Sequence, residues 1–192
     1  MLKGTSRSSL SRDLSSFLSA CLVLLFASVA TAQVKPPPAA DSHLVAPAAL
    51  AKLLPTPEGW TGGDVQLSQV DISSACSYTF ARVSYAKDEL RVKVTLADTG
   101  AHPESLMALA SLIAILPEDY DDKVPPATTI KRMKIEESQA AEMWDAEKTT
   151  GEITVVVGGR FVVAIEAQTA SDLEALRAML ASVDLKALAA LK

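Results

Sequence analysis

The sequence predicts a single α+β domain, in which an antiparallel sheet of five to seven strands is packed by helices. Apolar residues recur at every second position through much of 65–97 and 128–167, a spacing typical of strands. Residues 103–116 and 171–183 have helical spacing instead. A chain of 192 residues also has the usual length of one domain.

Residues 1–32 have the three regions of a cleavable secretory signal peptide. A basic start is followed by an apolar run of 13 residues, 17–29, and by the small residues Ala30-Thr31-Ala32 before Gln33. The run is shorter than the roughly 20 residues that a membrane-spanning helix needs. We therefore expect a periplasmic or secreted protein with no transmembrane segment after cleavage; an uncleaved signal anchor is the alternative.

The two cysteines have different expected fates. Leu18-Ser19-Ala20-Cys21 spells a lipobox, but the apolar region continues to Val29, so we expect Cys21 to leave with the signal. Lipid attachment to Cys21 is the alternative. Cleavage would leave Cys76 alone, which excludes an intramolecular disulfide. Cys76 lies in a strand-like run, where we expect a buried and unreactive thiol.

The charge balance excludes two classes of partner. Cleavage after Ala32 would remove three basic residues and one acidic residue, and so would change the net charge from −5 to −7. Nucleic acids and anionic lipid surfaces both select clustered Lys and Arg, which this acidic chain does not supply. The expected partner is an unidentified protein or a component of the cell envelope.

Residues 33–47 are rich in Pro and Ala and predict an extended tether, so that the α+β domain covers residues 48–192. A short helix is expected over 48–54, ended by Pro55. The alternation over 90–97 predicts a strand with one face in the core and one in water. The expected strands are residues 65–72, 75–86, 90–97, 128–136, 139–146, 153–157 and 161–167.

The C-terminal half contains two local signals, one for a hairpin turn and one for the start of a helix. Gly158-Gly159 predicts a two-residue hairpin turn in which Val157 faces Arg160, and both faces of that hairpin are apolar, which predicts a central position in the sheet. Ser171 and Glu174 have the spacing of a capping box, which predicts a helix start before the stripe Leu173, Leu176, Leu180 and Val183. A short terminal helix is expected after Asp184.

The order of these elements is similar to that of small exported bacterial proteins that are mostly uncharacterised, and more remotely resembles the PsbP-like α/β sandwich. The features that carry the resemblance are Leu54–Trp60, the strand ending in Thr149-Thr150-Gly151, the Val-Gly-Gly-Arg hairpin and the helix before Val183. The resemblance implies a non-enzymatic binding or assembly module. It implies no functional residue at any position.

Catalytic and metal-binding residue types are few. The histidines are His43 and His102, and neither has a nucleophile and an orienting partner at a useful spacing. The usual zinc ligand set is missing, and the acidic run Glu118, Asp119, Asp121 and Asp122 lacks the pattern of a calcium loop. We expect no cofactor, no metal and no enzymatic activity. A carboxylate pair is conceivable among Glu142, Asp145, Glu152 and Glu166.

The helix predicted over 103–116 has more apolar residues than one face of a sheet usually needs. It is either a well-buried helix, a lid over an apolar ligand or a partner-binding surface. The candidate surface consists of Leu106, Met107, Leu109, Leu112, Ile113 and Leu116. The sequence thus predicts an exported, non-enzymatic binding or assembly module of the bacterial envelope. The alternative is a carrier of an apolar small molecule, with the 103–116 helix as its lid.

Overall fold

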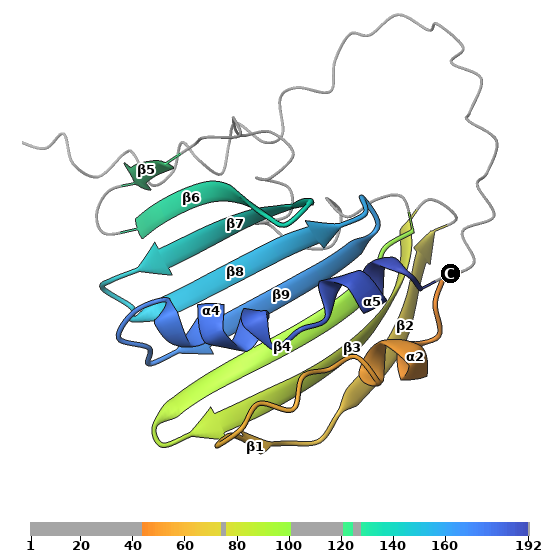
Figure 1. Ribbon diagram of the computed structural model, residues 1–192, viewed down its shortest axis with the longest axis horizontal. Coiled ribbons are helices and arrows are strands. Elements are labelled where there is room, and N and C mark those ends of the chain that lie inside the picture. The colour runs from red at the N-terminus through yellow and green to blue at the C-terminus, as the bar shows by residue number, and fades with distance from the viewer. Residues whose placement is uncertain (1–43, 74–75, 101–120, 125–127, 192) are drawn as a thin grey trace, which may run out of the picture. The chain divides into compact units, whose positions relative to one another are not determined.

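The computed structural model describes residues 44–73, 76–100, 121–124 and 128–191, all within one compact unit, Asp41–Lys192 (Figure 1). In these residues one antiparallel sheet carries three short helices. This confirms the predicted α+β class and the antiparallel sheet. The expected signal peptide, residues 33–43 of the tether and the 103–116 helix lie outside the described residues.

The sheet has nine strands in the described residues, so the predicted range of five to seven is wrong. Their order across the sheet is β1-β3-β4-β9-β8-β7-β6-β5, and β2 also pairs with β3. The strands are β1 (Thr61–Gly62), β2 (Gln66–Ser73), β3 (Cys76–Lys87), β4 (Leu90–Asp98), β5 (Asp121–Val124), β6 (Thr128–Ile135), β7 (Ser138–Asp145), β8 (Thr150–Val157) and β9 (Phe161–Gln168).

The two unexpected strands, β1 and β5, are short and polar. β1 has two residues, and β5 contains Asp121, Asp122 and Lys123. β1 pairs with the last residues of β3, and β5 pairs with the first half of β6, in both cases through backbone hydrogen bonds. Backbone pairing requires no apolar alternation, so side-chain spacing gives no signal for such strands.

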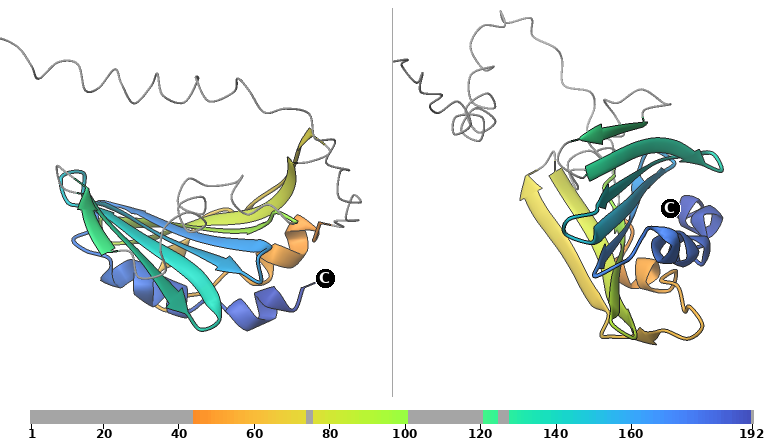
Figure 2. Two further views of the ribbon diagram at one scale, coloured as in Figure 1. Left: turned by 90° about the horizontal axis from the view of Figure 1, so that it is seen from above. Right: turned by 90° about the vertical axis from the view of Figure 1, so that its left-hand side faces the viewer.

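All three helices lie on one face of the sheet, which is the helix face; the other is the opposite face (Figure 2). The helices are α2 (Pro47–Ala51), α4 (Glu174–Ala181) and α5 (Leu185–Ala189). Leu50, Leu176 and Leu188, one from each helix, are fully buried in a cluster with strand residues. Val94, Ile153 and Ile165 are among these strand residues, since the side chains of every second residue point to the same face.

The opposite face differs from the prediction along β4. Arg91 is exposed and Lys93 is half-buried, as the alternation predicts, but Thr95 and Ala97 are buried. Their cross-strand partners on β9, Ala164 and Val162, are buried as well. The opposite face is therefore charged and partly exposed toward the start of β4, and buried toward its end, where its side chains are smaller and uncharged.

The β8–β9 hairpin is central in the sheet, as predicted, but its register differs by one residue. Val157 pairs with Phe161, so three residues rather than two form the turn. Gly158 and Gly159 have φ angles of 60° and 66°, in the region that glycine adopts most readily. Arg160 leaves the ladder because its guanidinium binds Asp98, on the neighbouring strand β4.

The start of α4 is capped by a different residue from the one predicted. Asp172 Oδ1 accepts the Glu174 N–H at 2.9 Å, whereas Ser171 bonds only to Asp172. The capping-box prediction for Ser171 is thus wrong, because the helix begins at Glu174, two residues later than a cap at Ser171 requires. The short terminal helix is confirmed, and Asp184 caps it by accepting the Ala187 N–H at 2.8 Å.

Candidate functional site

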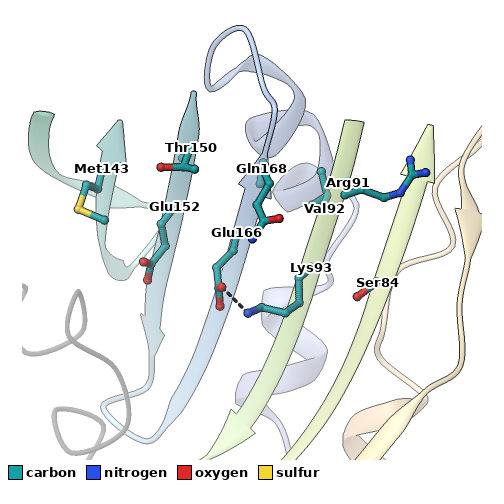
Figure 3. Close-up of a pocket in the computed structure, with 11 residues that line it drawn as sticks. Ser84, Arg91, Val92, Lys93, Met143, Thr150, Glu152, Glu166 and Gln168 are labelled. Atoms are coloured by element: carbon teal, nitrogen blue, oxygen red, sulfur yellow. Dashed lines mark ion pairs between the residues drawn. The ribbon is translucent and has the colours of Figure 1, made fainter. Parts of the chain in front are cut away.

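A row of polar side chains crosses the opposite face near the start of β4 (Figure 3). Lys93 of β4 lies opposite Glu166 of β9, and Glu166 lies opposite Glu152 of β8. Ser84 of β3 and Met143 of β7 extend the row at its two ends. Directly opposed residues in an antiparallel sheet have Cβ atoms about 4.5–5.5 Å apart, so the register alone brings these side chains within reach of one another.

The row forms the floor of a depression of about 300 Å³. Thr150 and Gln168 line it on one side of the row, as Figure 3 shows. Ser84 and Gln168 are exposed, while Glu152 and Glu166 are half-buried. A ligand could thus reach both carboxylates from solvent.

Of the two carboxylates, Glu166 is the one that forms an ion pair with Lys93. The Lys93 Nζ contacts Glu166 Oε2, and each of these two side chains is about one third exposed (36% and 34%). The other cation that lines the depression, Arg91, donates to the backbone carbonyls of Asp88 and Leu90, and so turns toward the β3–β4 hairpin.

The pKa of Glu152 is raised above its ordinary value, first because burial disfavours the charged carboxylate, and further because Glu166 is negative. The Thr154 hydroxyl, which donates to Glu152 Oε1 at 2.9 Å, lowers this pKa by more than Glu166 raises it, and the positive Lys93 lowers it least, but burial keeps the pKa raised. The two opposed carboxyls therefore have different environments, in which Glu152 holds a proton more tightly than an isolated glutamate does.

This arrangement can perform two kinds of chemistry. The two adjacent carboxylates share one nearby lysine, Lys93. Their remaining oxygen lone pairs could therefore accept hydrogen bonds from a ligand's ammonium or guanidinium group. A carboxyl that holds its proton beside one that is ion-paired is also the arrangement of an acid–base pair. Within the described residues no group of three or more His, Cys, Asp or Glu side chains could hold a metal ion.

The structure separates the four carboxylates considered from the sequence. Glu152 and Glu166 come together, whereas Glu142 lies on the helix face, where it binds Arg177 of α4. Asp145 is the last residue of β7, and its carboxylate accepts the N–H groups of Glu147 and Lys148 in the turn that follows. Only the Glu152–Glu166 pair faces a depression on the opposite face.

Other residues singled out from the sequence lie outside the described residues. His43, His102, Glu118 and Asp119 are among them, and for Cys76 the backbone alone is described, as part of β3. The candidate apolar surface of the 103–116 helix is outside them in full: Leu106, Met107, Leu109, Leu112, Ile113 and Leu116.

Lys93, Ser84 and Gln168 line the depression, but the sequence did not single them out. The alternation in residues 90–97 placed Lys93 on the expected wet face, which was the available signal. The role of Lys93 depends on the pairing of β4 with β9, which places it opposite Glu166, a residue 73 positions later in the chain. Spacing within one strand carries no information on that pairing.

A second depression, of about 350 Å³, lies on the helix face beside Trp144, Leu173 and Arg177. Its charged centre is the ion pair between Glu142 and Arg177, in which each partner satisfies the other. We therefore assign the polar row of the opposite face, and not this depression, as the candidate site.

Comparison of the chain with family models, curated proteins and solved structures finds no match. No helix among the described residues is long and apolar enough to cross a membrane.

Proposed function

We propose that this chain is an exported, non-enzymatic binding module of the bacterial envelope, and that its opposite face binds a cationic group of its partner. The single observation that supports the proposal is the Glu152–Glu166 pair, of which only Glu166 has a lysine partner. The basic start, apolar run and small residues of 1–32 support export.

The chemistry of the site favours a basic ligand group. An ammonium or guanidinium placed between the two carboxylates would offset the mutual repulsion that raises the pKa of Glu152, after burial. Gln168 and Thr150 flank the pair, and Ser84 lies beyond Lys93 in the same depression; all three have groups that form hydrogen bonds and so could orient the ligand. A lysine or arginine side chain of a partner protein, or an amine of an envelope component, has the required charge.

A titration of the chain with the peptide trilysine amide tests the proposal, with the Nε-acetylated peptide as the neutral comparison. We expect the charged peptide to shift the backbone amide resonances of β8 and β9 around Glu152 and Glu166, and the acetylated peptide to leave them unchanged. Glu152→Gln should weaken binding by about tenfold, which corresponds to 1.4 kcal/mol.

Glu147→Gln is the matched control, because it removes the same charge from an exposed turn outside the depression. Equal loss of binding in the two variants would show that the peptide responds to net charge alone, and would contradict the proposed site. Equal binding of both peptides to the native chain would contradict it as well.

A second candidate function is acid–base hydrolysis, for which the different environments of the two carboxyls are the supporting observation. Two features favour binding over catalysis. The depression is open, so water reaches both carboxylates, and Glu166 is already held in an ion pair with Lys93. Turnover of a glycoside or ester that is lost in both Glu152→Gln and Glu166→Gln would favour the hydrolase.

The export part of the proposal has its own test, native mass spectrometry of the chain recovered gently from the cells that produce it. A chain that begins at Gln33 supports export, and one that still contains Met1 contradicts it. A bound apolar small molecule that solvent extracts would favour the alternative function, a carrier.

A further inference from the structure

The depression on the helix face differs in chemistry from the polar row of the opposite face. This helix-face depression has a volume of about 350 Å³, at the low end of the range typical of small-molecule sites. Its floor consists of two opposed pairs of β6 and β7 residues, Thr129 with Trp144 and Lys131 with Glu142. Its wall is the start of α4, which packs on the neighbouring strands β8 and β9 (Figure 1). The depression therefore lies in the step between α4 and the two strands beside it.

The Trp144 indole occupies space that a glycine leaves open. Trp144 lies opposite Gly151 of β8. A Cβ atom at Gly151 would lie 3.1 Å from Trp144 Cε3 and 2.7 Å from Leu173 Cδ2, so a larger residue would displace both side chains. A glycine inside a strand often marks such a close approach. Trp144 is thus packed against the core yet partly exposed at the depression, and a ring fixed in this way loses little freedom when a ligand stacks on it.

The charges around the indole are balanced. Four of the side chains that line the depression are charged, two of each sign: Lys131, Arg177, Glu142 and Asp172. Arg177 also donates to both carboxylate oxygens of Glu142, at 2.8 and 2.7 Å. The opposite face has two carboxylates beside one lysine, whereas this depression offers no net charge to attract an ion. It therefore suits a neutral ligand.

The rim of the depression both donates and accepts hydrogen bonds. Lys131 and Asp172 are exposed there, and the ammonium donates while the carboxylate, whose Oδ1 caps α4, keeps further acceptor sites. The Thr129 hydroxyl can do both. A wholly apolar ligand would take these groups out of water without giving them partners, which costs affinity. The depression thus favours a ligand with an apolar face and polar groups around its edge.

We infer that the helix-face depression binds a neutral sugar ring, which stacks on Trp144 and exchanges hydrogen bonds with Lys131 and Asp172. The face of a pyranose ring presents C–H groups with a partial positive charge, and the face of an indole is negative. The hydroxyls of the sugar project from its edge, toward the rim. The inference goes beyond the cation-binding function and is independent of it, because the two depressions lie on opposite faces of the sheet.

A titration with methyl β-D-glucopyranoside, followed by NMR of the indole N–H resonances, tests the inference. The chain has two tryptophans, and Trp60 is the internal control because it lies elsewhere, beside Lys87. We expect the Trp144 resonance to shift in a saturable way and the Trp60 resonance to stay in place. Trp144→Leu removes the aromatic face and should weaken binding about tenfold, as measured from the backbone amide of Leu173.

A rim variant tests the site without altering the core. Lys131→Ala removes one charged hydrogen bond and should weaken binding about threefold or more. Lys134→Ala is the matched control, since it removes the same charge from an exposed position of β6 whose side chain projects to the other face of the sheet. It should bind the sugar as the native chain does. Both variants should keep the native thermal midpoint.

Three outcomes overturn the inference: a Trp144 resonance that does not shift, equal shifts of the two indoles, or equal loss of binding in the two lysine variants. A β-1,4-linked glucose tetramer then identifies the source of the sugar. Tighter binding of the tetramer than of the glucoside supports a site for one ring of a glycan chain. Equal affinities support a site for a single sugar.

Discussion

Asp98 and Arg160 form a two-pronged ion pair between β4 and the turn of the β8–β9 hairpin. Arg160 Nε donates to Asp98 Oδ1 at 2.8 Å, and Nη2 donates to Oδ2 at 2.6 Å. The same carboxylate accepts the N–H of Val45 at 2.7 Å and that of Gly100 at 2.9 Å. One fully buried side chain thus joins the segment before α2, the end of β4 and the hairpin turn.

Replacement of Asp98 by alanine should be strongly destabilising. The change leaves the Arg160 guanidinium and two backbone N–H groups without their acceptor, and breaking a buried ion pair in this way costs about 3–5 kcal/mol. Urea denaturation of Asp98→Ala measures the loss. Asp184→Ala, which removes an exposed cap of α5, is the comparison and should lose far less; equal losses would contradict a central role for Asp98.

The pH dependence of stability should carry the signature of Asp98. Burial opposes its ionisation, but hydrogen bonds from Arg160, Val45 and Gly100 outweigh burial and lower the pKa of Asp98 below its usual 3.8. The native state therefore binds this proton less tightly than the unfolded state does. The resulting stability is fully present above the unfolded pKa and is lost as pH falls through the lowered native pKa.

Asp98→Asn cannot lose a charge on acidification, so the stability difference between the native chain and this variant should shrink as pH falls below about 4. Urea midpoints measured between neutral pH and acid check this. A difference that stays constant down to the lowest pH would show that Asp98 ionisation is not coupled to folding.

Glu142 and Arg177 should give an unequal pair of variants. Arg177 Nε and Nη2 donate to the two carboxylate oxygens at 2.8 and 2.7 Å, but the Glu142 side chain is 5% exposed while that of Arg177 is 51% exposed. Arg177→Met leaves a buried carboxylate unpaired and should cost about 3 kcal/mol. Glu142→Gln leaves an arginine that water can solvate and should cost about 1 kcal/mol. The reverse order in thermal or urea denaturation would contradict this account of burial.

Much of the sheet could be predicted, because each long strand has a recognisable pattern in its own residues. The seven strands expected between residues 65 and 167 each correspond to an observed strand, with ends that differ by up to three residues. Alternating apolar residues identify a half-buried strand without knowledge of its neighbours. The hairpin register failed because Arg160 is drawn out of the ladder by Asp98, 62 residues earlier in the chain. A contact over that separation leaves no local pattern.

The candidate site was predictable only as a set of residue types. Glu152 and Glu166 were two of four carboxylates considered, and the order β4-β9-β8 brings this pair together beside Lys93. Strand order depends on the packing of the whole sheet. The relation of the chain to PsbP-like proteins, its export and its lack of enzymatic activity stay predictions.

Glu152 should destabilise the native chain at neutral pH. Its raised pKa means that the native state binds this proton more tightly than the unfolded state does, first because of burial. The corresponding stability is fully present below the unfolded pKa, about 4.3, and is lost as pH rises through the native pKa. Glu152→Gln imitates the protonated form, so this variant should be more stable than the native chain at pH 7 and equally stable in acid.

Urea denaturation at the two pH values measures the effect, and Glu147→Gln controls for the change in net charge. If Glu152→Gln proves less stable than the native chain at pH 7, the carboxylate has a stabilising partner and the site is not short of a cation.

The pKa of Glu152 itself, followed by NMR of its side-chain carboxyl carbon with and without trilysine amide, tests the proposed binding site most directly. In the free protein the account predicts a pKa above the ordinary glutamate value, and the peptide should lower it, because a bound ammonium stabilises the carboxylate. The backbone amide resonance of Glu147, in an exposed turn outside the depression, should not shift when the peptide is added. A Glu152 pKa at the ordinary value, or one that the peptide does not change, would contradict the claim that this pair of carboxylates binds a cation.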